Sequence, residues 1–559
     1  MTENLPAIRA QDQGLFQAAV TSLMRDMARH PLIYGPNGSP VQPVISAGYK
    51  KFSRESARRE GSIKTWIPRR LFGVMSEALE REQISDRASD LVNNNGYAAG
   101  AVQTVAVTTI GPGLTPHPTF EPEALGLSKD EARAVQTQMR GVWQAWAPWA
   151  DAAERMSFGA IQFQAMRNLM QFGEYLALLP MLADDPARPY SLAVQLLHPS
   201  RLATPGDKSQ GNVIDGVEIG PHGQPLAYWI KRVDPANRED LRPNVSTNFL
   251  RVPARIGWRW QVLHGFCATE PEQVRGVSPF APIMKLFKDL SDYLNAELVS
   301  NIVTAAFSLF IETGAGVDPL YPAGALATMS ETGTNADGES QTVRYQEMEP
   351  GQIMYGNTGE KPHPIAANRP GSTFDPFIRL ILKAISSGLG VPYPILFKDM
   401  DAMSFAGYRG AMLEAWRVFV MLRSRMGEQF CSPVYGMLME EAWLRGEIEV
   451  DDFYAKRFQL CRTEWRGYPK GDIEPIKQVQ ANIAAIDARL KTRTAAVAED
   501  GGDFYAVVET LEDEQRLLEE KGLLGGSAAP AGAAAGPPGS LDFDDDQAEA
   551  EAFLERMTS

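Results

Sequence analysis

The sequence contains few of the side chains that form disulfides and metal sites. Of its 559 residues only three are cysteines, Cys267, Cys431 and Cys461, and they form no CxxC pair. A sparse, odd-numbered set of this kind predicts a reducing compartment and no structural zinc. The six histidines are scattered without the spacing that metal ligands show. We therefore expect no metal and no cofactor.

Targeting and membrane-spanning segments are also missing. Residues 1–6 are not a basic region followed by an apolar one, so no signal peptide is expected. The most apolar stretch, residues 296–311, is shorter than the ~20 residues of a membrane span, and it contains Glu297 and Asn301. These features predict a soluble protein, made in the cytoplasm, without a membrane partner.

Common catalytic motifs are absent as well. The sequence has no GxSxG and no HExxH, and residues 351–356 begin like a phosphate-binding loop but lack its Lys and Ser/Thr. Asp399 and Asp401 form a carboxylate pair in a predicted loop, a pattern more typical of solvated turns. We expect no enzyme. A soluble multidomain hydrolase that uses these loop carboxylates remains the alternative.

The net charge is −15, from 54 basic and 69 acidic side chains, which argues against a simple basic DNA-binding module. The charge is uneven: residues 1–70 carry 11 basic and 5 acidic side chains, whereas residues 526–559 carry 7 acids and one arginine. The basic arm is either a solvated segment or one that docks on an acidic partner or nucleic acid. The Ala-, Gly- and Pro-rich tail is predicted to be disordered.

Hydrophobic periodicity predicts an α+β fold that is mainly helical. Residues 75–170 have a helical pattern, including a helix over 85–107 and another over 128–149 with Ser128 as its N-cap. Trp143, Trp146 and Trp149 lie three apart, so we expect one core-facing helix surface. Residues 174–266 contain short strands, with a hairpin turn at 220–223.

The second half of the chain is predicted to alternate long helices with irregular segments. A helix over 278–312 begins at Ser278 and Pro279, and a polar excursion over 315–371 follows with strands at 342–348 and 352–355. Further along, we expect the elements to be a helix over 375–390, an irregular segment over 395–407, one or two helices over 408–445 and three helices over 472–523.

Several blocks in this order are similar to the lambda-type phage portal proteins. The matching segments are 90–98 with 110–114, 215–219 with 223–228, His264 with 273–279, 388–393, and 465–477 with 490–501. The family-motif positions are Arg275, Gly276, Gly388, Gly390, Pro392, Ser404 and Arg409. The run 403–409 keeps only Ser404 and Arg409 of the family pattern, and Glu474 stands where the family has Asp.

The resemblance implies a homo-oligomeric ring, typically a dodecamer, in the virion at one vertex of the capsid. Double-stranded DNA would be packaged through it by terminase and later ejected. Its partners would be the terminase large subunit, the major capsid and scaffold proteins, and a head-completion or adaptor protein. Assembly would occur in the host cytoplasm. Another head component, such as a capsid–protease fusion, is a third possibility, but no protease motif supports it.

The resemblance also implies a subunit plan. Its parts are a basic arm (1–74), a wing (75–277), a first stem helix (278–314), a clip (315–371), a second stem helix (372–392), a tunnel loop (393–407), a long helix with the wing return (408–471), a crown (472–525) and an acidic tail (526–559). A conduit must not grip DNA, and acidic walls repel phosphate. The channel candidates are Asp289, Asp292 and Glu297 on the stem, which are as well suited to pairing between subunits, and Lys398, Asp399 and Asp401 in the loop, where Lys398 could touch phosphate.

Overall fold

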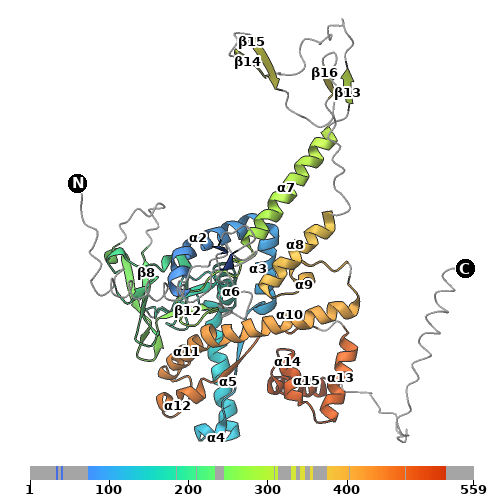
Figure 1. Cartoon of the computed structure of the whole chain (residues 1–559). Helices are drawn as coiled ribbons and strands as arrows, with labels where there is room; N and C mark the ends of the chain where they lie inside the picture. The colour runs from blue at the N-terminus through green and yellow to red at the C-terminus, as the bar shows by residue number, and fades with distance from the viewer. Residues whose placement is uncertain are drawn as a thin grey trace, which may run out of the picture. The chain divides into compact units, whose positions relative to one another are not determined.

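The computed structural model describes residues 73–183, 185–208, 211–232, 245–306, 374–401, 403–471 and 474–523, and elsewhere the backbone of short strands. The chain divides into two units, residues 1–72 and 73–559. Within the first unit the described part is an antiparallel pair of strands, β1 (Ile33–Tyr34) and β2 (Pro40–Val41). All other elements belong to the second unit (Figure 1).

The first part of the second unit is helical, as the periodicity predicts. Its helices are α2 (Gly73–Asn94), α3 (Gly96–Thr109), α4 (Pro122–Leu125), α5 (Lys129–Trp146) and α6 (Phe158–Phe172). The single helix expected over 85–107 is wrong, because Asn95 leaves the helical conformation and caps α3 by accepting a hydrogen bond from Ala98 N. Ser128 caps α5 as predicted, in a reciprocal capping box with Glu131.

The tryptophan surface of α5 is only partly as expected. Trp143 and Trp146 are buried, and the Trp146 indole donates to the carbonyl of Leu192 at 2.8 Å. Trp149 lies beyond the end of α5 in a 3-10 turn and is 47% exposed. The prediction that it shares the core face is therefore wrong, because the helix ends one turn too early.

Small antiparallel sheets follow. In one, β4 (Glu174–Leu178) lies between β12 (Val262–Phe266) and β5 (Gln195–Leu197). The other sheet has the strand order β6 (Val213–Ile214), β7 (Val217–Ile219), β8 (Pro225–Lys231) and β9 (Phe249–Pro253). The predicted turn at 220–223 joins β7 to β8. A short antiparallel pair, β10 (Arg255–Ile256) and β11 (Arg259–Trp260), follows β9.

Two helices pair beyond the sheets, α7 (Met284–Ala306) and α8 (Phe374–Leu389) (Figure 1). The expected span of the first, 278–312, is too long at both ends. Residues 278–283 form turns, in which the buried Phe280 accepts from the backbone of Ile283, and residues Leu309–Glu312 form strand β13. The helix is therefore about 34 Å long, from 1.5 Å per residue, rather than about 50 Å.

The pairing of α7 with α8 rests on aromatic and close contacts. The Tyr293 ring stacks with Phe374 at 5.8 Å between centroids and meets Phe377 edge-on at 5.2 Å. At the other end, Gly388 lies so close to Ile283 that an added Cβ would be 2.4 Å from its Cγ2 atom. Glycine at this position therefore permits the close approach of the two helices.

Between these helices the structure describes only strand backbones. β13 pairs in parallel with β16 (Ile353–Gly356), and β14 (Met329–Thr334) pairs with β15 (Ser340–Tyr345). The strands predicted at 342–348 and 352–355 overlap β15 and β16. The rest of the predicted excursion lies outside the described residues.

The segment after α8 is more regular than expected. Within the predicted irregular stretch 395–407, α9 (Tyr393–Phe397) covers the beginning and α10 (Phe405–Met426) starts before the end. A buried π-helical turn, η7 (Gly427–Cys431), joins α10 to α11 (Ser432–Leu444). The chain continues through α12 (Phe453–Leu460) to β17 (Thr463–Arg466), which pairs with β3 (Thr115–Pro118).

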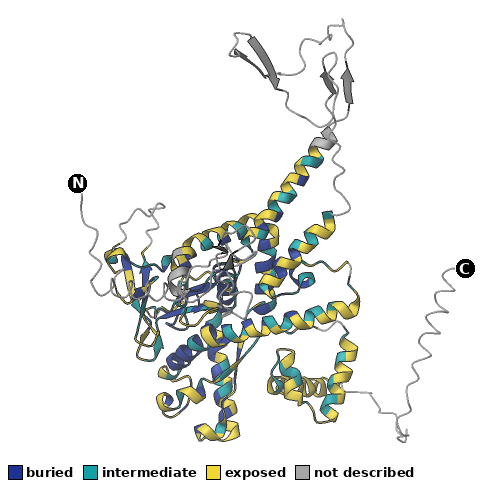
Figure 2. Ribbon diagram, viewed as in Figure 1, coloured by how far each residue is buried: buried dark blue, intermediate teal, exposed yellow. Residues whose placement is uncertain are grey.

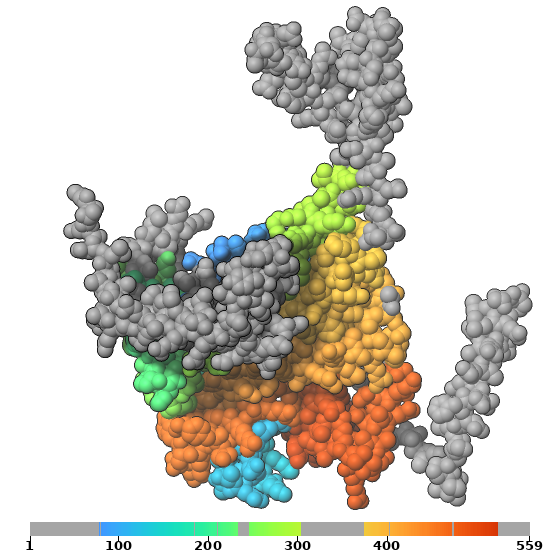
Figure 3. Space-filling view, in the orientation of Figure 1, coloured from blue at the N-terminus to red at the C-terminus, as the bar shows by residue number. Residues whose placement is uncertain are grey.

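Three helices close the described chain, as predicted: α13 (Pro475–Asp487), α14 (Arg493–Glu499) and α15 (Phe504–Glu520). The main hydrophobic core is formed by α3, α5, α6, α10 and α11 together with β4 and the paired ends of α7 and α8. Figure 2 shows this core in dark blue and the last three helices in yellow and teal, without dark blue. In Figure 3 the same three helices form the orange-red mass beside α10.

Candidate functional site

The motif arginine Arg275 lies in a buried charge network rather than on a surface. Its Nε atom is 3.0 and 2.8 Å from the two carboxylate oxygens of Glu174, and its Nη2 atom also contacts that carboxylate. Both side chains are at least 96% buried. Glu174 begins β4, and its Oε2 atom is 2.9 Å from Nε2 of His264 on β12. A buried charge needs such pairing to be tolerated.

The rest of the Arg275 guanidinium binds backbone carbonyls. Nη1 donates to the carbonyls of Leu202 (2.8 Å) and Asp215 (2.9 Å), and Nη2 donates to that of Pro199 (3.2 Å). The Asp215 carboxylate pairs with Arg81 of α2. The network thus joins α2, both sheets and the segment that leads to α7.

Protonation in this network is set by burial and by the arginine. Burial opposes the charge of Glu174, but the Arg275 guanidinium and the hydrogen bonds from Arg275 and His264 outweigh it, so the pKa of the carboxyl lies well below its usual 4.5. Burial lowers the pKa of His264 below its usual 6.5, against the raising effect of Glu174. The network therefore holds an ionised Glu174 and a neutral His264.

Gly276 is required where two backbone segments meet. Its N–H donates to Oε2 of Glu174 at 3.0 Å, and a Cβ added to it would lie 2.2 Å from the carbonyl oxygen of Gly173. Gly173 ends α6 with φ +85°, a left-handed conformation that favours glycine. Arg275 and Gly276 therefore fix the chain that leads into α7, which gives this motif a structural role.

In the predicted tunnel loop, the structure gives the charged residues different surroundings. Lys398 ends α9 in the left-handed region (φ 58°) and is exposed. Asp399 accepts a hydrogen bond from the Tyr393 hydroxyl and lies 3.4 Å from Nη1 of Arg379. The Tyr393 hydrogen bond and the Arg379 charge keep the pKa of Asp399 below its usual 3.8. Asp401 is exposed.

The stem candidates also differ from one another. Asp289 pairs with Lys285 at 2.6 Å, and Asp292 pairs with Lys288, each one helical turn apart on the outer surface of α7. Glu297 is 97% buried within the chain. The structure brings none of these three acids together with Asp399 or Asp401 in a described contact.

The remaining motif positions shape the chain around the loop. Gly390 has φ +69° just after α8, and Pro392 is the residue before the first turn of α9. Ser404 caps α10, because its hydroxyl accepts from Gly407 N at 3.2 Å. Arg409 is exposed on α10.

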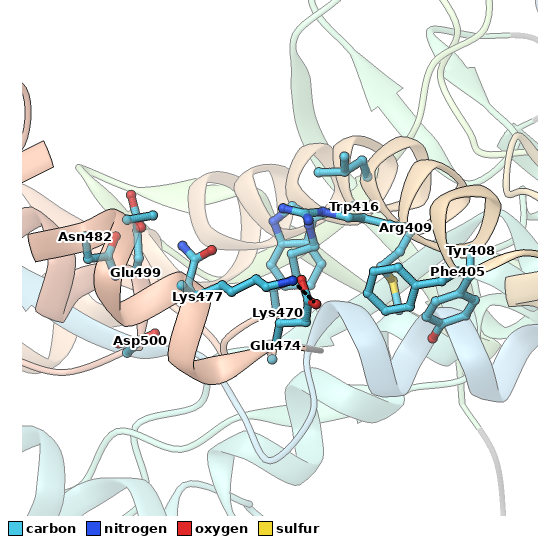
Figure 4. Close-up of a pocket in the computed structure, with 15 residues that line it drawn as sticks. Phe405, Tyr408, Arg409, Trp416, Lys470, Glu474, Lys477, Asn482, Glu499 and Asp500 are labelled. Carbon is cyan, nitrogen blue, oxygen red and sulfur yellow. Dashed lines mark hydrogen bonds and ion pairs between the residues drawn. The ribbon is translucent and has the colours of Figure 1, made fainter. Parts of the chain in front are cut away.

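A groove of about 750 Å³ lies between α10 and α13 (Figure 4). Aromatic side chains of α10, among them Tyr408 and Trp416, line one wall, and the charged residues Lys470, Glu474 and Lys477 line the other. Lys477 pairs with Glu474 at 2.8 Å. Sequence reasoning identified Arg409 but missed this groove, because the residues that line it are far apart in the chain.

Sequence reasoning also missed the partners of Arg275. Glu174 begins the apolar strand β4, and a carboxylate in a buried strand requires a cation as its partner. This is the one signal for the ion pair that the sequence offers. Among the described residues there is no cluster of His, Cys, Asp and Glu that could hold a metal ion. None of the helices in the described ranges is long and apolar enough to cross a membrane.

Comparison with known sequences defines the class of protein. The model of the lambda family of phage portal proteins matches residues 59–423, more than half of the chain. The chain belongs to this family. It is therefore a phage portal protein, which forms the DNA-packaging channel. The hydrolase alternative has no support.

Individual relatives agree over nearly the full length. The portal protein of Escherichia phage N15 is 25% identical over 93% of this chain and 99% of its own length. Portal protein B of Escherichia phage lambda is 24% identical over 85% and 91%. The probable portal protein of Halomonas phage phiHAP-1 is 24% identical over 90% and 93%.

Solved structures with a similar chain come from gene transfer agent particles. A chain in the neck of the native particle, computed with C12 symmetry, covers 62% of this chain and 80% of its own at 12% identity and a TM-score of 0.34. A chain of the native virion covers 71% and 94% at 14% identity and a TM-score of 0.34. At TM-scores this low the likeness carries no argument.

Proposed function

We propose that the chain assembles into a closed dodecameric ring at one capsid vertex. Double-stranded DNA passes through the ring without sequence preference, inward during packaging by terminase and outward during ejection. The ring also nucleates head assembly and joins the head to the tail. In this proposal the chain has no catalytic activity of its own.

The observation that carries the proposal is the order of elements after the wing. Helix α7, the β-strand excursion, helix α8, the loop after α9 and the long helix α10 follow one another as stem, clip, stem, tunnel loop and wing return do in the plan that the family implies. In this proposal α7 and α8 form the stem, residues 398–404 form the tip of the tunnel loop, and α13–α15 form the crown.

Electrostatics of the described residues suit a conduit. Tight binding of DNA comes from lysines and arginines that replace the counterions of phosphates. On α7, Lys285 and Lys288 are already paired with Asp289 and Asp292, so each pair adds no net charge to the stem surface. In the loop, Asp399 offsets Arg379, and Asp401 balances Lys398. Such a surface guides a duplex without holding it.

The proposed partners follow from the positions of the clip and the wing in the portal plan. The clip, most of which lies outside the described residues, would bind the terminase large subunit during packaging and a head-completion or adaptor protein afterwards. The wing would face the major capsid and scaffold proteins. The mature location is the virion, after assembly in the host cytoplasm.

The test is the assembly and packaging activity of the full chain. Native mass spectrometry and negative-stain imaging of the purified protein should give a closed ring with a central hole. Prohead particles that contain the ring should protect DNA from nuclease when terminase and ATP are present. A stable monomer, or rings whose proheads never protect DNA, would contradict the proposal.

A further inference from the structure

The last three helices of the described chain have no core of their own. In α13, α14 and α15 no residue is buried, and every residue from 505 to 523 is exposed. Helices of 7 to 17 residues are marginal in water and depend on the packing of an apolar face. Something other than the described residues must therefore cover these helices in the working protein.

On α13 the uncovered apolar face is separate from the groove. Ile476, Val479 and Ile483 lie at i, i+3 and i+7, so they share one side of the helix, and they are 73%, 56% and 54% exposed. The opposite side, with Lys477, Gln478 and Ala481, lines the groove against α10 (Figure 4). The helix is thus fixed to its own chain on one side and bare on the other.

On α15 there is a second bare apolar face. Val507, Leu511 and Leu518 lie at i, i+4 and i+11 on one side, and they are 41%, 56% and 39% exposed. Another side of the same helix meets α5, because Arg133 lies 5.0 Å from the Tyr505 ring centroid and Asp503 pairs with Arg140. The described chain therefore exposes two distinct apolar surfaces, one on α13 and one on α15.

The charges beside the two faces are complementary. The second half of α15 is acidic, with Glu512, Asp513, Glu514, Glu519 and Glu520 against the single Arg516. Arg489 lies in the turn after α13 and Arg493 begins α14, and both are exposed without an ion pair to a described residue. A ring interface needs two different surfaces on each subunit, one for each neighbour.

We infer that the α13 face of one subunit packs against the α15 face of the next copy of this chain. Ile476, Val479 and Ile483 cover Val507, Leu511 and Leu518, and the arginines after α13 meet the acids of α15. The inference rests on the proposed ring and names the surfaces that close it at the crown. Repetition around the ring gives a continuous belt of helices and covers both bare faces.

Cysteine cross-linking between two variants tests this pairing. Chains with Ile483→Cys and chains with Leu511→Cys are co-expressed, the rings are purified and oxidised, and dimers are resolved on a denaturing gel. We expect a disulfide-linked dimer from the mixture and none from either variant alone. The matched control replaces Ile483→Cys by Ala481→Cys on the groove side of α13, and it should give no dimer with Leu511→Cys. The parent chain, with its own cysteines, sets the background.

Each other outcome overturns the inference in a recognisable way. Dimers from Ile483→Cys alone would mean that two copies of α13 face each other. Equal dimer formation with Ala481→Cys would mean that the contact is not specific to the apolar face. If intact rings were seen in the microscope but no cross-links formed, the crown interface would lie elsewhere and the proposed portal function would still stand. If the parent chain formed no rings, the proposed function itself would be contradicted.

Discussion

Arg275 and Glu174 form a buried, doubly hydrogen-bonded ion pair across 101 positions of sequence. The arginine lies in the segment that leads into α7, and the glutamate begins β4, the central strand of a three-stranded sheet. The direction in which the chain enters α7 is therefore fixed by one charge pair and the carbonyls around it.

Removal of the arginine should destabilise the fold strongly. Arg275→Leu leaves Glu174 buried and unpaired, and the loss of one partner of a buried pair typically costs about 3–5 kcal/mol. Urea unfolding should show this decrease in the free energy of unfolding. The control is Arg251→Leu, which removes a partly exposed pair with Glu218 and should cost about 0–1 kcal/mol. Equal losses in both variants would contradict the special role of Arg275.

Acidification should weaken the same region in two stages. The pKa of His264 is lower in the fold than its usual 6.5, so the unfolded chain takes up a proton first and stability falls as the pH drops below that value. The pKa of Glu174 is also lowered, so its contribution is present above 4.5 and is lost below it. Melting temperatures between about pH 7.5 and about pH 5 should decline less in His264→Gln. If the melting temperatures of the parent chain and of His264→Gln fell in parallel, protonation of His264 would not be the cause of the decline.

A larger side chain at position 388 should lower the stability of the fold, and a smaller side chain at position 283 should restore part of it. Gly388→Ala forces a methyl group against Ile283 Cγ2, and such overpacking costs about 1–3 kcal/mol. The double variant with Ile283→Ala removes the clash, so its loss should be smaller than the sum of the two single losses. Thermal unfolding of the four proteins measures this coupling, and strict additivity would show that the two residues do not meet.

Charge reversal in the tunnel loop should make DNA transport sensitive to salt. Asp401→Lys places two neighbouring cations at the tip, and each phosphate contact strengthens DNA binding at low salt by counterion release. We expect slower packaging into proheads at low salt and partial recovery as the salt concentration rises. The control Asp451→Lys makes the same charge change at an exposed position in the turn before α12. Unchanged packaging by Asp401→Lys would remove this side chain from the channel wall.

Asp503 should connect the start of α15 to α5 through its charge and cap α15 through its side-chain oxygen. It pairs with Arg140 and lies 3.6 Å from His117, and it accepts a hydrogen bond from Tyr505 N at 2.9 Å. Asp503→Asn retains a capping oxygen but loses the ion pair, whereas Asp503→Ala loses both, and loss of an N-cap costs about 0.5–2 kcal/mol. The rate of backbone amide hydrogen exchange in α15 should be higher in Asp503→Asn than in the parent chain, and higher still in Asp503→Ala. Equal exchange in the two variants would argue against a separate capping effect.

The sequence predicts the order of helices well because their periodicity is strong. In α8, Leu382 and Ile385 are buried as an amphipathic pattern requires, and Ser128, Ser404 and Thr492 begin helices as capping residues do. The ends of α7 are less predictable. Ser278 and Pro279 have the local features of a helix start, but burial of Phe280 holds the chain in turns until Met284.

The candidate site could be predicted only in part. The motif locates Arg275 and Gly276, but their partners Glu174, Arg81 and Asp215 come from three other segments and carry no local signal. The loop acids Asp399 and Asp401 look equivalent in the sequence. The structure separates them, because Tyr393 and Arg379 engage only the first.

The hydrogen bond from Arg81 Nε to the carbonyl of Gly276, at 3.0 Å, joins positions that are 195 residues apart. A contact of this kind forms only after the intervening chain has been synthesised and has closed its loops, so it belongs to the late steps of folding. The direction of α7 is therefore set only when the two ends of this 195-residue loop have met.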